Sequence, residues 1–201
     1  MKKIILLLLC AAVLPCRADS PLTSTSWWEQ YESHAIIREA VENGFSERVM
    51  AFLCNPAEPV ELRLAVVNCL GWSIVGYDRY TPCIEYYKQA HKLTDEELDG
   101  QMSPETACVL AYLWALDDYF HVGQAYSLAE KAHGLKPTSR AVSMVYGLIA
   151  AQVAFDTDWC AVYRHVATVA YDTTLVPDMS DYAVGRIMEY IDLYKSECGE
   201  E

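Results

Sequence analysis

The sequence lacks the short motifs by which many enzyme classes are recognised. It contains no glycine-rich phosphate loop, no Gly-x-Ser-x-Gly nucleophile turn and no His-Glu-x-x-His zinc motif. No two of its cysteines form a Cys-x-x-Cys pair, which argues against a dithiol redox centre and a structural zinc site of that spacing. We therefore expect a protein that is not an enzyme, with no cofactor and no bound metal.

Clustered positive charge and long apolar runs are also scarce. The chain has 15 Lys and Arg against 28 Asp and Glu, a formal net charge of -13, and its basic residues form no cluster. Basic patches supply most of the attraction to nucleic acids and anionic lipids, so neither is an expected partner. Beyond the N-terminus no stretch approaches the roughly 18 apolar residues of a membrane helix, so no integral span is expected.

The N-terminus has the layout of a secretory signal peptide. Two lysines precede an apolar run at residues 4–14, which is too short to span a bilayer, and small residues follow up to Asp19. Cleavage after Ala18 removes three basic residues and no acid, so the formal charge of the mature chain becomes -16. An alternative is a lipoprotein acylated at Cys16. Both predict an exported protein, periplasmic or secreted, and in the second case attached to the outer membrane.

Six cysteines remain after residue 18, and export permits disulfides among them. Sequence alone cannot choose between the possible pairings. Most of these cysteines lie in apolar helical runs, where cysteine acts as a small buried hydrophobe. We expect mostly buried thiols and at most one disulfide among Cys54, Cys69, Cys83, Cys108, Cys160 and Cys198.

Helix boundary signals recur along the chain, whereas alternating strand patterns are nearly absent. Ser26 with Glu29 matches a capping box, which predicts a helix to Asn43 that ends at Gly44. The β-branched clusters lie within helical periodicity, so the sequence predicts an all-α fold. Further helix starts are predicted at Ser46, Pro59, Thr94, Ser103, Ser139 and Ser180.

A pattern of small and large residues repeats along these helices. It is clearest in Val67-x2-Leu70-Gly71-x2-Ile74, which is followed by Cys83-x3-Tyr87-x2-Ala90. This resembles the tetratricopeptide repeat, W-x2-L-G-x2-Y followed by A-x3-F-x2-A; a longer relative with glycines at its helix ends is a near alternative. Two looser units follow, at Ala107, Leu110, Ala111, Trp114, Ala125, Ala129 and Ala132, and at Ser143, Tyr146, Gly147, Ala150, Ala161, His165 and Thr168.

The resemblance implies a right-handed solenoid of antiparallel helix pairs. Small residues at Gly71, Ala111 and Gly147 would let helices cross closely, and His165 would be buried. Stacked units bury their faces only against neighbours, so both ends need caps. The predicted organisation is a signal peptide (1–18), an N-terminal helix pair (19–57), repeats (58–177) and a C-terminal capping helix with an acidic tail (178–201).

In this family the first helices of successive units line a concave groove that receives a peptide or partner protein. Counting from the three small residues, the resemblance places eight residues in that groove: Asn68, Trp72, Val75, Cys108, Tyr112, Ala115, Met144 and Leu148. Trp and Tyr often anchor interfaces, so Trp72 and Tyr112 are the expected hot spots. The alternative is that these side chains belong to the core, covered by a terminal helix.

Three functional interpretations follow. The leading one is an exported, non-catalytic protein that binds another protein or a peptide through an apolar and aromatic groove. The second is a metal-binding or small-ligand-binding protein, or an enzyme, that uses Asp117, Asp118 and His121, although paired acids at a predicted turn are usually solvated or cap a helix. The third is a structural subunit that associates with copies of itself.

Overall fold

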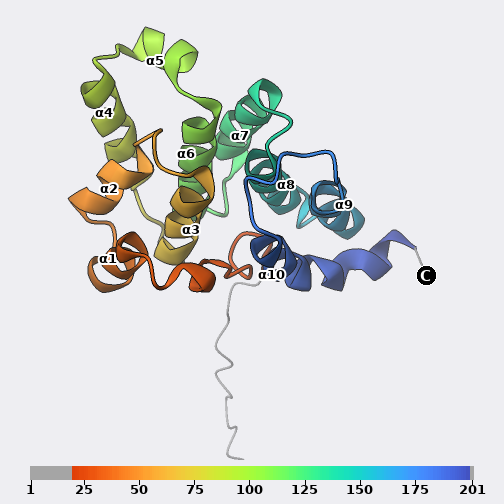
Figure 1. Ribbon diagram of the computed structural model, residues 1–201. Coiled ribbons are helices and arrows are strands. Elements are labelled where there is room, and N and C mark those ends of the chain that lie inside the picture. The colour runs from red at the N-terminus through yellow and green to blue at the C-terminus, as the bar shows by residue number, and fades with distance from the viewer. Residues whose placement is uncertain (1–19, 200–201) are drawn as a thin grey trace, which may run out of the picture.

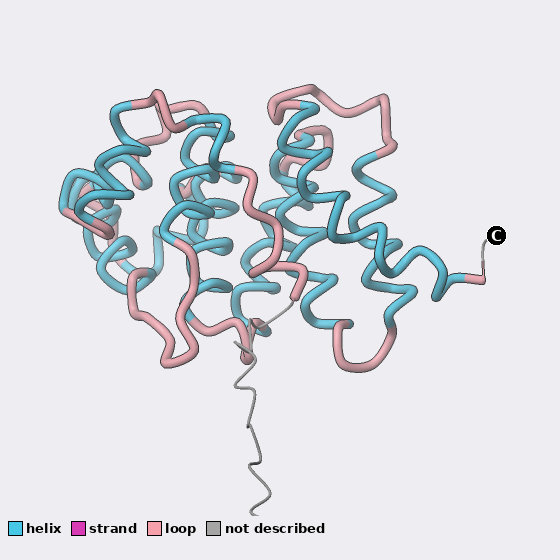
Figure 2. The backbone as a smooth tube through the Cα atoms, turned by 90° about the horizontal axis from the view of Figure 1, so that it is seen from below, coloured by secondary structure: helices cyan, strands magenta, loops and turns pink. Residues whose placement is uncertain are grey.

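The computed structural model describes residues 20–199, and its regular structure is helical (Figures 1 and 2). The elements are η1 (Trp28–Tyr31), α1 (Ala35–Asn43), α2 (Glu47–Leu53), α3 (Val60–Leu70), α4 (Tyr80–His91), α5 (Asp95–Gln101), α6 (Pro104–Asp117), α7 (Gly123–Leu135), α8 (Arg140–Ala154), α9 (Trp159–Ala170), α10 (Asp181–Ile191) and η2 (Asp192–Cys198). Between residues 20 and 199 the only β-type pairing is an isolated bridge of Ser139 with Val176. The predicted all-α fold is confirmed.

Two predictions about the N-terminus concern residues that this structure does not describe. The predicted signal peptide, residues 1–18, and the alternative acylation site Cys16 lie outside the described residues. Within residues 20–199, none of the helices has the length and apolar character needed to cross a bilayer.

Side-chain caps determine where most of the helices begin. Ser46, Ser103, Ser139 and Ser180 each accept a hydrogen bond from the backbone amide three residues later, at the starts of α2, α6, α8 and α10. Thr94 forms a full capping box with Glu97 at the start of α5. Such caps satisfy amides that have no partner within the helix, which is why these starts could be predicted from the sequence.

The predicted helix from Ser26 to Asn43 is wrong in its first half. A short 3-10 helix, η1, replaces it, and α1 begins only at Ala35. The amides of Trp27 and Trp28, which a capping box would leave free for a helix start, are instead bound by the side chain of Asn68. The predicted end is confirmed, since Gly44 follows α1 with a φ of 64°.

Helices α6 to α9 pack as consecutive neighbours connected by short turns. Each contacts the next along the chain, and α6 also contacts α8. At Gly147 on α8, an added Cβ would lie 2.6 Å from the backbone oxygen of His165 on α9, so only glycine allows this crossing. Ala111 is fully buried in α6. His165 contributes its backbone here while its side chain is exposed, so the prediction of a buried His165 is wrong.

The region from α2 to α4 is built differently. Helix α3 ends at Leu70, and Gly71 adopts a φ of 62° with no atom near the position of a Cβ. Gly71 therefore ends a helix and does not permit a crossing, which corrects the prediction. Helix α2 contacts both α3 and α4, and residues 71–79 form a loop between them. Ile74, predicted within the first helix of a unit, lies in this loop.

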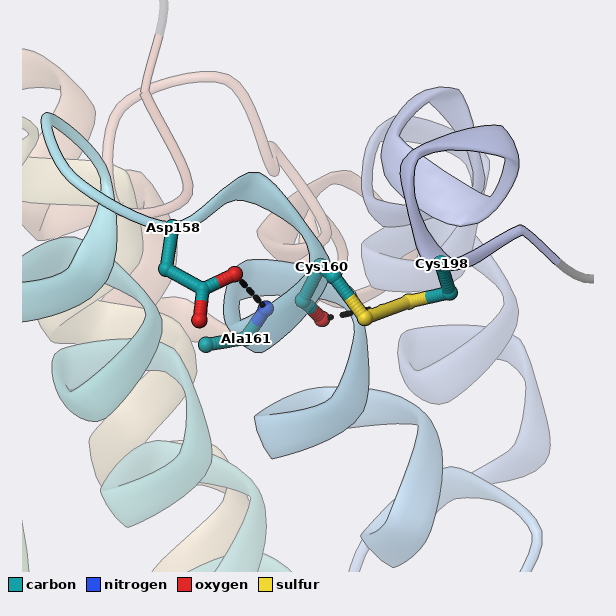
Figure 3. Close-up of a disulfide and its surroundings, with 4 residues drawn as sticks. All are labelled: Asp158, Cys160, Ala161 and Cys198. Carbon is teal, nitrogen blue, oxygen red and sulfur yellow. Dashed lines mark hydrogen bonds between the residues drawn. A yellow bond between two sulfur atoms is a disulfide. The ribbon is translucent and has the colours of Figure 1, made fainter.

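The C-terminal elements pack against α9. Helix α10 contacts α9, and η2 contacts both. A disulfide between Cys160 and Cys198 joins α9 to η2, next to the Asp158 carboxylate, which accepts from the Ala161 amide at 2.9 Å (Figure 3). The remaining thiols between residues 20 and 199 are free, and most are buried, as expected: Cys54, Cys69, Cys83 and Cys108.

Candidate functional site

Most of the predicted groove belongs to the protein core. Five of its eight residues are at most 1% exposed: Cys108, Tyr112, Ala115, Met144 and Leu148. Trp72 and Val75 lie beyond the end of α3, because the helix stops at Leu70. The prediction of an open groove is therefore wrong for the five buried residues, and the alternative that they form core is correct. Asn68 and Trp72 are half-buried, and Val75 is exposed.

The chain's own N-terminal segment, residues 20–31, covers Asn68. The Asn68 Oδ1 accepts from the backbone amides of Trp27 at 3.0 Å and Trp28 at 3.2 Å. Its Nδ2 donates to the Thr25 carbonyl at 3.1 Å and to the Tyr112 hydroxyl at 2.9 Å. Trp27 is fully buried. Asn68 thus binds backbone groups of a short segment just before η1, as a peptide-binding residue would, but the peptide belongs to the same chain.

Helix α10 lies beside this N-terminal segment (Figure 1). The Gln30 side chain donates to the Ser180 hydroxyl at 2.8 Å, and the Ser180 amide donates to Glu61 on α3 at 2.6 Å. The N-terminal segment is therefore held both by α3 and by α10.

Tyr112, which accepts a hydrogen bond from Asn68, is fully buried. Burial raises the pKa of Tyr112 to about 12, although the hydrogen bond from Asn68 acts in the opposite direction.

Asp117, at the end of α6, holds the loop of residues 71–79. Its Oδ2 accepts from the amides of Arg79 at 2.6 Å and Tyr80 at 2.9 Å, and so caps the start of α4 from a different helix. Its Oδ1 accepts from the Arg79 Nε at 2.6 Å. Its backbone oxygen accepts from the Tyr77 amide at 2.9 Å. Both side chains of this ion pair are buried, so Asp117 has a structural role.

Arg79 connects the same carboxylate to the end of α3. Its terminal nitrogens donate to the carbonyls of Leu70 at 3.2 Å and Gly71 at 2.8 Å. These carbonyls belong to a helix terminus, where intrahelical partners are missing and positive charge is favourable. The guanidinium also lies 4.2 Å from the centre of the Tyr77 ring. One buried ion pair therefore fixes the end of α3, the loop and the start of α4.

The acidic cluster considered for metal or acid–base chemistry is not brought together. Asp117 points inward to Arg79, whereas Asp118 and His121 form an exposed pair, with a carboxylate oxygen 3.0 Å from Nδ1. Within residues 20–199, no group of three or more His, Cys, Asp and Glu side chains is placed to hold a metal ion. The sequence predicted that the two acids at this turn are solvated or cap a helix; Asp118 is exposed and Asp117 caps α4.

An apolar surface that sequence reasoning missed lies where the α3–α4, α6–α7 and α8–α9 connections meet. We call it the turn edge; it consists of residues 73–78, 117–123 and 152–156, with Ser20 beside them. Its exposed apolar residues are Ile74 (70%), Val75 (89%), Tyr77 (49%), Phe120 (62%) and Val153 (52%). The repeat pattern placed Ile74 in the first helix of a unit and Val75 in the predicted groove, whereas both lie in the loop that follows α3.

The turn edge contains two open pockets that share one wall. A pocket of 560 Å³ lies between residues 73–78 and the turn after α6, and one of 440 Å³ lies between that turn and the end of α8. Residues 119–121 line both of them. Phe120 is the exposed apolar residue of this wall and His121 beside it is also exposed, so the two form a ridge between the two hollows.

A further pocket of 660 Å³ lies between α1, α2 and α4. It is lined by polar and charged groups, such as Arg48 and His91, and by the half-buried rings of Phe52 and Tyr86. None of its large apolar lining residues belongs to the strongly exposed set that marks the turn edge. The turn edge is therefore the better candidate for a binding surface.

Comparisons of the chain with protein-family models, with curated proteins and with solved structures found no match. The resemblance to tetratricopeptide repeats consequently depends on the residues and on the packing of the helices described above.

Proposed function

We propose that this chain is an exported, non-catalytic helical-repeat protein of the cell envelope that binds another protein through the turn edge. The observation that carries the proposal is the set of five strongly exposed apolar side chains on three adjacent connections. Contiguous exposed apolar surface on a soluble domain is characteristic of interaction sites. Phe120 and Tyr77 are aromatic, and aromatic residues are enriched at protein interfaces.

The arrangement of the rest of the molecule supports binding at this edge in preference to the concave face. The N-terminal segment already occupies Asn68, with Trp27 fully buried, so a competing peptide would first have to displace it. The loop of the turn edge is fixed by the buried pair of Arg79 and Asp117. A surface that is ordered before binding loses less entropy when a partner docks.

The proposed helical repeats resemble tetratricopeptide repeats in two units and depart from them in one. Helices α6 to α9, with the close crossing at Gly147, support two stacked units. Helices α3 and α4 supply a third, open unit whose connecting loop belongs to the turn edge. Export is inferred from the N-terminal sequence and predicts a mature chain that begins at Asp19, or at an acylated Cys16. Intact-mass measurement of the protein from its native envelope tests that inference.

Substitution of the exposed apolar residues tests the binding proposal. The variant Ile74→Ser/Val75→Ser/Phe120→Ser removes three of the five exposed apolar residues of the turn edge, and Leu135→Ser/Tyr171→Ser/Leu193→Ser removes three similarly exposed apolar residues elsewhere. Each tagged protein is purified from the native envelope after cross-linking, and bound proteins are quantified by mass spectrometry. We expect the wild type and the control to retain the same partner, and the turn-edge variant to lose it.

Two outcomes would overturn this proposal. If the turn-edge variant retains the partner as well as the wild type does, the edge does not bind it. If sedimentation shows that the wild type associates with itself and that the turn-edge variant does not, the third interpretation, a self-associating subunit, replaces the proposal. Circular dichroism spectra of both variants establish that each is folded.

A further inference from the structure

We infer that the partner presents an amphipathic, positively charged helix to the turn edge. Two apolar side chains one helical turn apart would occupy the pockets on either side of Phe120, and lysines or arginines beside them would face Asp78, Asp118 and Asp156. This inference depends on the proposed function and specifies the chemistry of the partner.

The shape is that of two hollows separated by a ridge. The two pockets share residues 119–121, and Phe120 is 62% exposed on the wall between them. A partner that fills both pockets must place one apolar group on each side of this ridge. Residues three or four apart on a helix lie on the same face about 5–6 Å from one another, so a helix can present such a pair. This is the way amphipathic helices dock into apolar grooves.

Acidic side chains line both pockets, and the only basic group among the lining residues is His121, which lies 3.0 Å from the Asp118 carboxylate. Asp78 and Asp118 line the first pocket and Asp156 lines the second, and all three are exposed. No lysine or arginine lines either pocket. The nearest guanidinium, that of Arg79, is buried and paired with Asp117. Charged groups across an interface are arranged to be complementary, so the matching partner surface is basic.

The walls of the pockets are held in place from behind. The Tyr77 amide donates to the Asp117 backbone oxygen at 2.9 Å, and the Arg79 guanidinium packs on the Tyr77 ring. The Tyr119 ring packs edge-to-face on Trp72, with centroids 4.8 Å apart, and lies against Phe120 with centroids 4.1 Å apart. The two hollows therefore exist before a partner arrives, which favours a partner of defined shape.

The same features disfavour other occupants. Nucleic acids and anionic lipids would place negative charge against the three aspartates. A second copy of this chain docked through the same edge would bring acid against acid, and like charges opposed across an interface are destabilising. A basic helix is the occupant that satisfies both the apolar ridge and the acidic rim.

A defined peptide probe tests this assignment. A short amphipathic helical peptide of leucine and lysine is titrated into the mature chain and followed by fluorescence anisotropy, with a leucine and glutamate counterpart as the opposite charge. The variant Asp78→Asn/Asp118→Asn/Asp156→Asn removes the rim charge and keeps side-chain size. Its matched control, Glu42→Gln/Glu96→Gln/Glu197→Gln, removes three exposed acids elsewhere.

We expect the leucine and lysine peptide to bind the wild type and the control with the same affinity. The rim variant should bind about tenfold more weakly, since each rim charge contributes a fraction of a kcal/mol, and its affinity should depend less on salt. The leucine and glutamate peptide should not bind. Equal affinity of the rim variant and the wild type would overturn the inference, and so would equal losses in the rim variant and the control.

The two proposals fail in distinguishable ways. If the native partner is lost when Ile74, Val75 and Phe120 are replaced by serine but is retained by the rim variant, the edge binds a protein and the basic helix is wrong. If the native partner survives the serine substitutions, the proposed function itself is wrong, whatever the peptide does.

Discussion

The unit formed by α3 and α4 and the units formed by α6 to α9 are held together by different interactions. Between α8 and α9 the contact is close packing, with a backbone oxygen where a side chain of residue 147 would begin. Between α3 and α4 a loop intervenes, α2 lies against both helices, and a buried ion pair from α6 connects them. The unit that matches the repeat pattern best in sequence is the one that departs from it in structure.

The comparison shows that one residue type serves two physical roles. Gly71 and Gly147 both follow the repeat pattern, but Gly71 takes a conformation with positive φ and no neighbours, and Gly147 lies in a helix against another backbone. Glycine is favoured in both situations, in the first by its conformational freedom and in the second by its lack of a Cβ. Because α3 ends at Leu70, the residues that follow it form a loop, and residues 73–78 of this loop belong to the turn edge.

Removing the ion pair of Arg79 and Asp117 should lower the free energy of unfolding more than any other change considered, because this pair connects α3, the loop and α4. Asp117→Ala leaves the Arg79 guanidinium buried without its carboxylate and leaves the amides of Arg79 and Tyr80 without acceptors. Breaking a buried pair in this way typically lowers the free energy of unfolding by about 3–5 kcal/mol. Urea unfolding measures this change in the free energy of unfolding. The control is Asp118→Ala, an exposed neighbour, which should change stability by at most about 0.5 kcal/mol.

Replacing Asn68 should separate the N-terminal segment from the first unit. Asn68→Ala removes two acceptor and two donor interactions, which should lower the free energy of unfolding by about 2–4 kcal/mol. Limited proteolysis should then cleave within residues 20–31 faster than in the wild type. Asn55→Ala, which removes only a local bond to the Ala57 amide, serves as the control. Equal cleavage rates in the two variants would show that Asn68 does not hold the segment.

The close packing of the later units can be tested with two helical glycines. Gly147→Ala places a Cβ against the His165 backbone and should lower the free energy of unfolding by about 1–3 kcal/mol. Gly185→Ala in α10 meets no atom within 4 Å and should raise it by about 0.5–1 kcal/mol, because alanine favours the helix. Thermal or urea unfolding distinguishes the two. Effects of the same sign would contradict the assignment of Gly147 to a crossing.

The smallest effect depends on pH and comes from Tyr112, which connects α6 to Asn68 on α3. Burial raises the pKa of Tyr112 from 10.0 to about 12. Between these values the unfolded chain has lost the proton and the folded chain has kept it, so stability present below pH 10 is lost as pH rises through 12. From pH 9 to 11 the wild type should lose about 1.3 kcal/mol more than Tyr112→Phe. Parallel pH profiles would contradict a buried, neutral Tyr112.

The fold could be predicted from sequence where local chemistry decides it. Hydroxyl caps at Ser46, Ser103, Ser139 and Ser180 satisfy amides within three residues, so the starts of these helices follow from neighbouring residues alone. The start near Ser26 failed because the competing acceptor, Asn68, is 41 residues away from Trp27. Contacts between distant segments leave no local trace in a single sequence.

The candidate site could be predicted much less well, for the same reason. The eight groove positions have suitable side chains, but the N-terminal segment covers the face on which Asn68 and Tyr112 lie. Ile74 and Val75 fit helical periodicity, and only the end of α3 at Leu70 turns them into exposed loop residues. Asp117 could be recognised as a turn acid, whereas its pairing with Arg79, 38 residues earlier, could not.

Hydrogen exchange at the amides of Tyr77, Arg79 and Tyr80 tests most directly whether Asp117 fixes the loop that opens the first unit. Amides in a loop and at the start of a helix ordinarily lack intrahelical acceptors and exchange fast. Here each donates to Asp117, so we predict slow exchange in the wild type and in Asp118→Ala, and fast exchange of Arg79 and Tyr80 in Asp117→Ala. Fast exchange of all three amides in the wild type would contradict a loop held by Asp117.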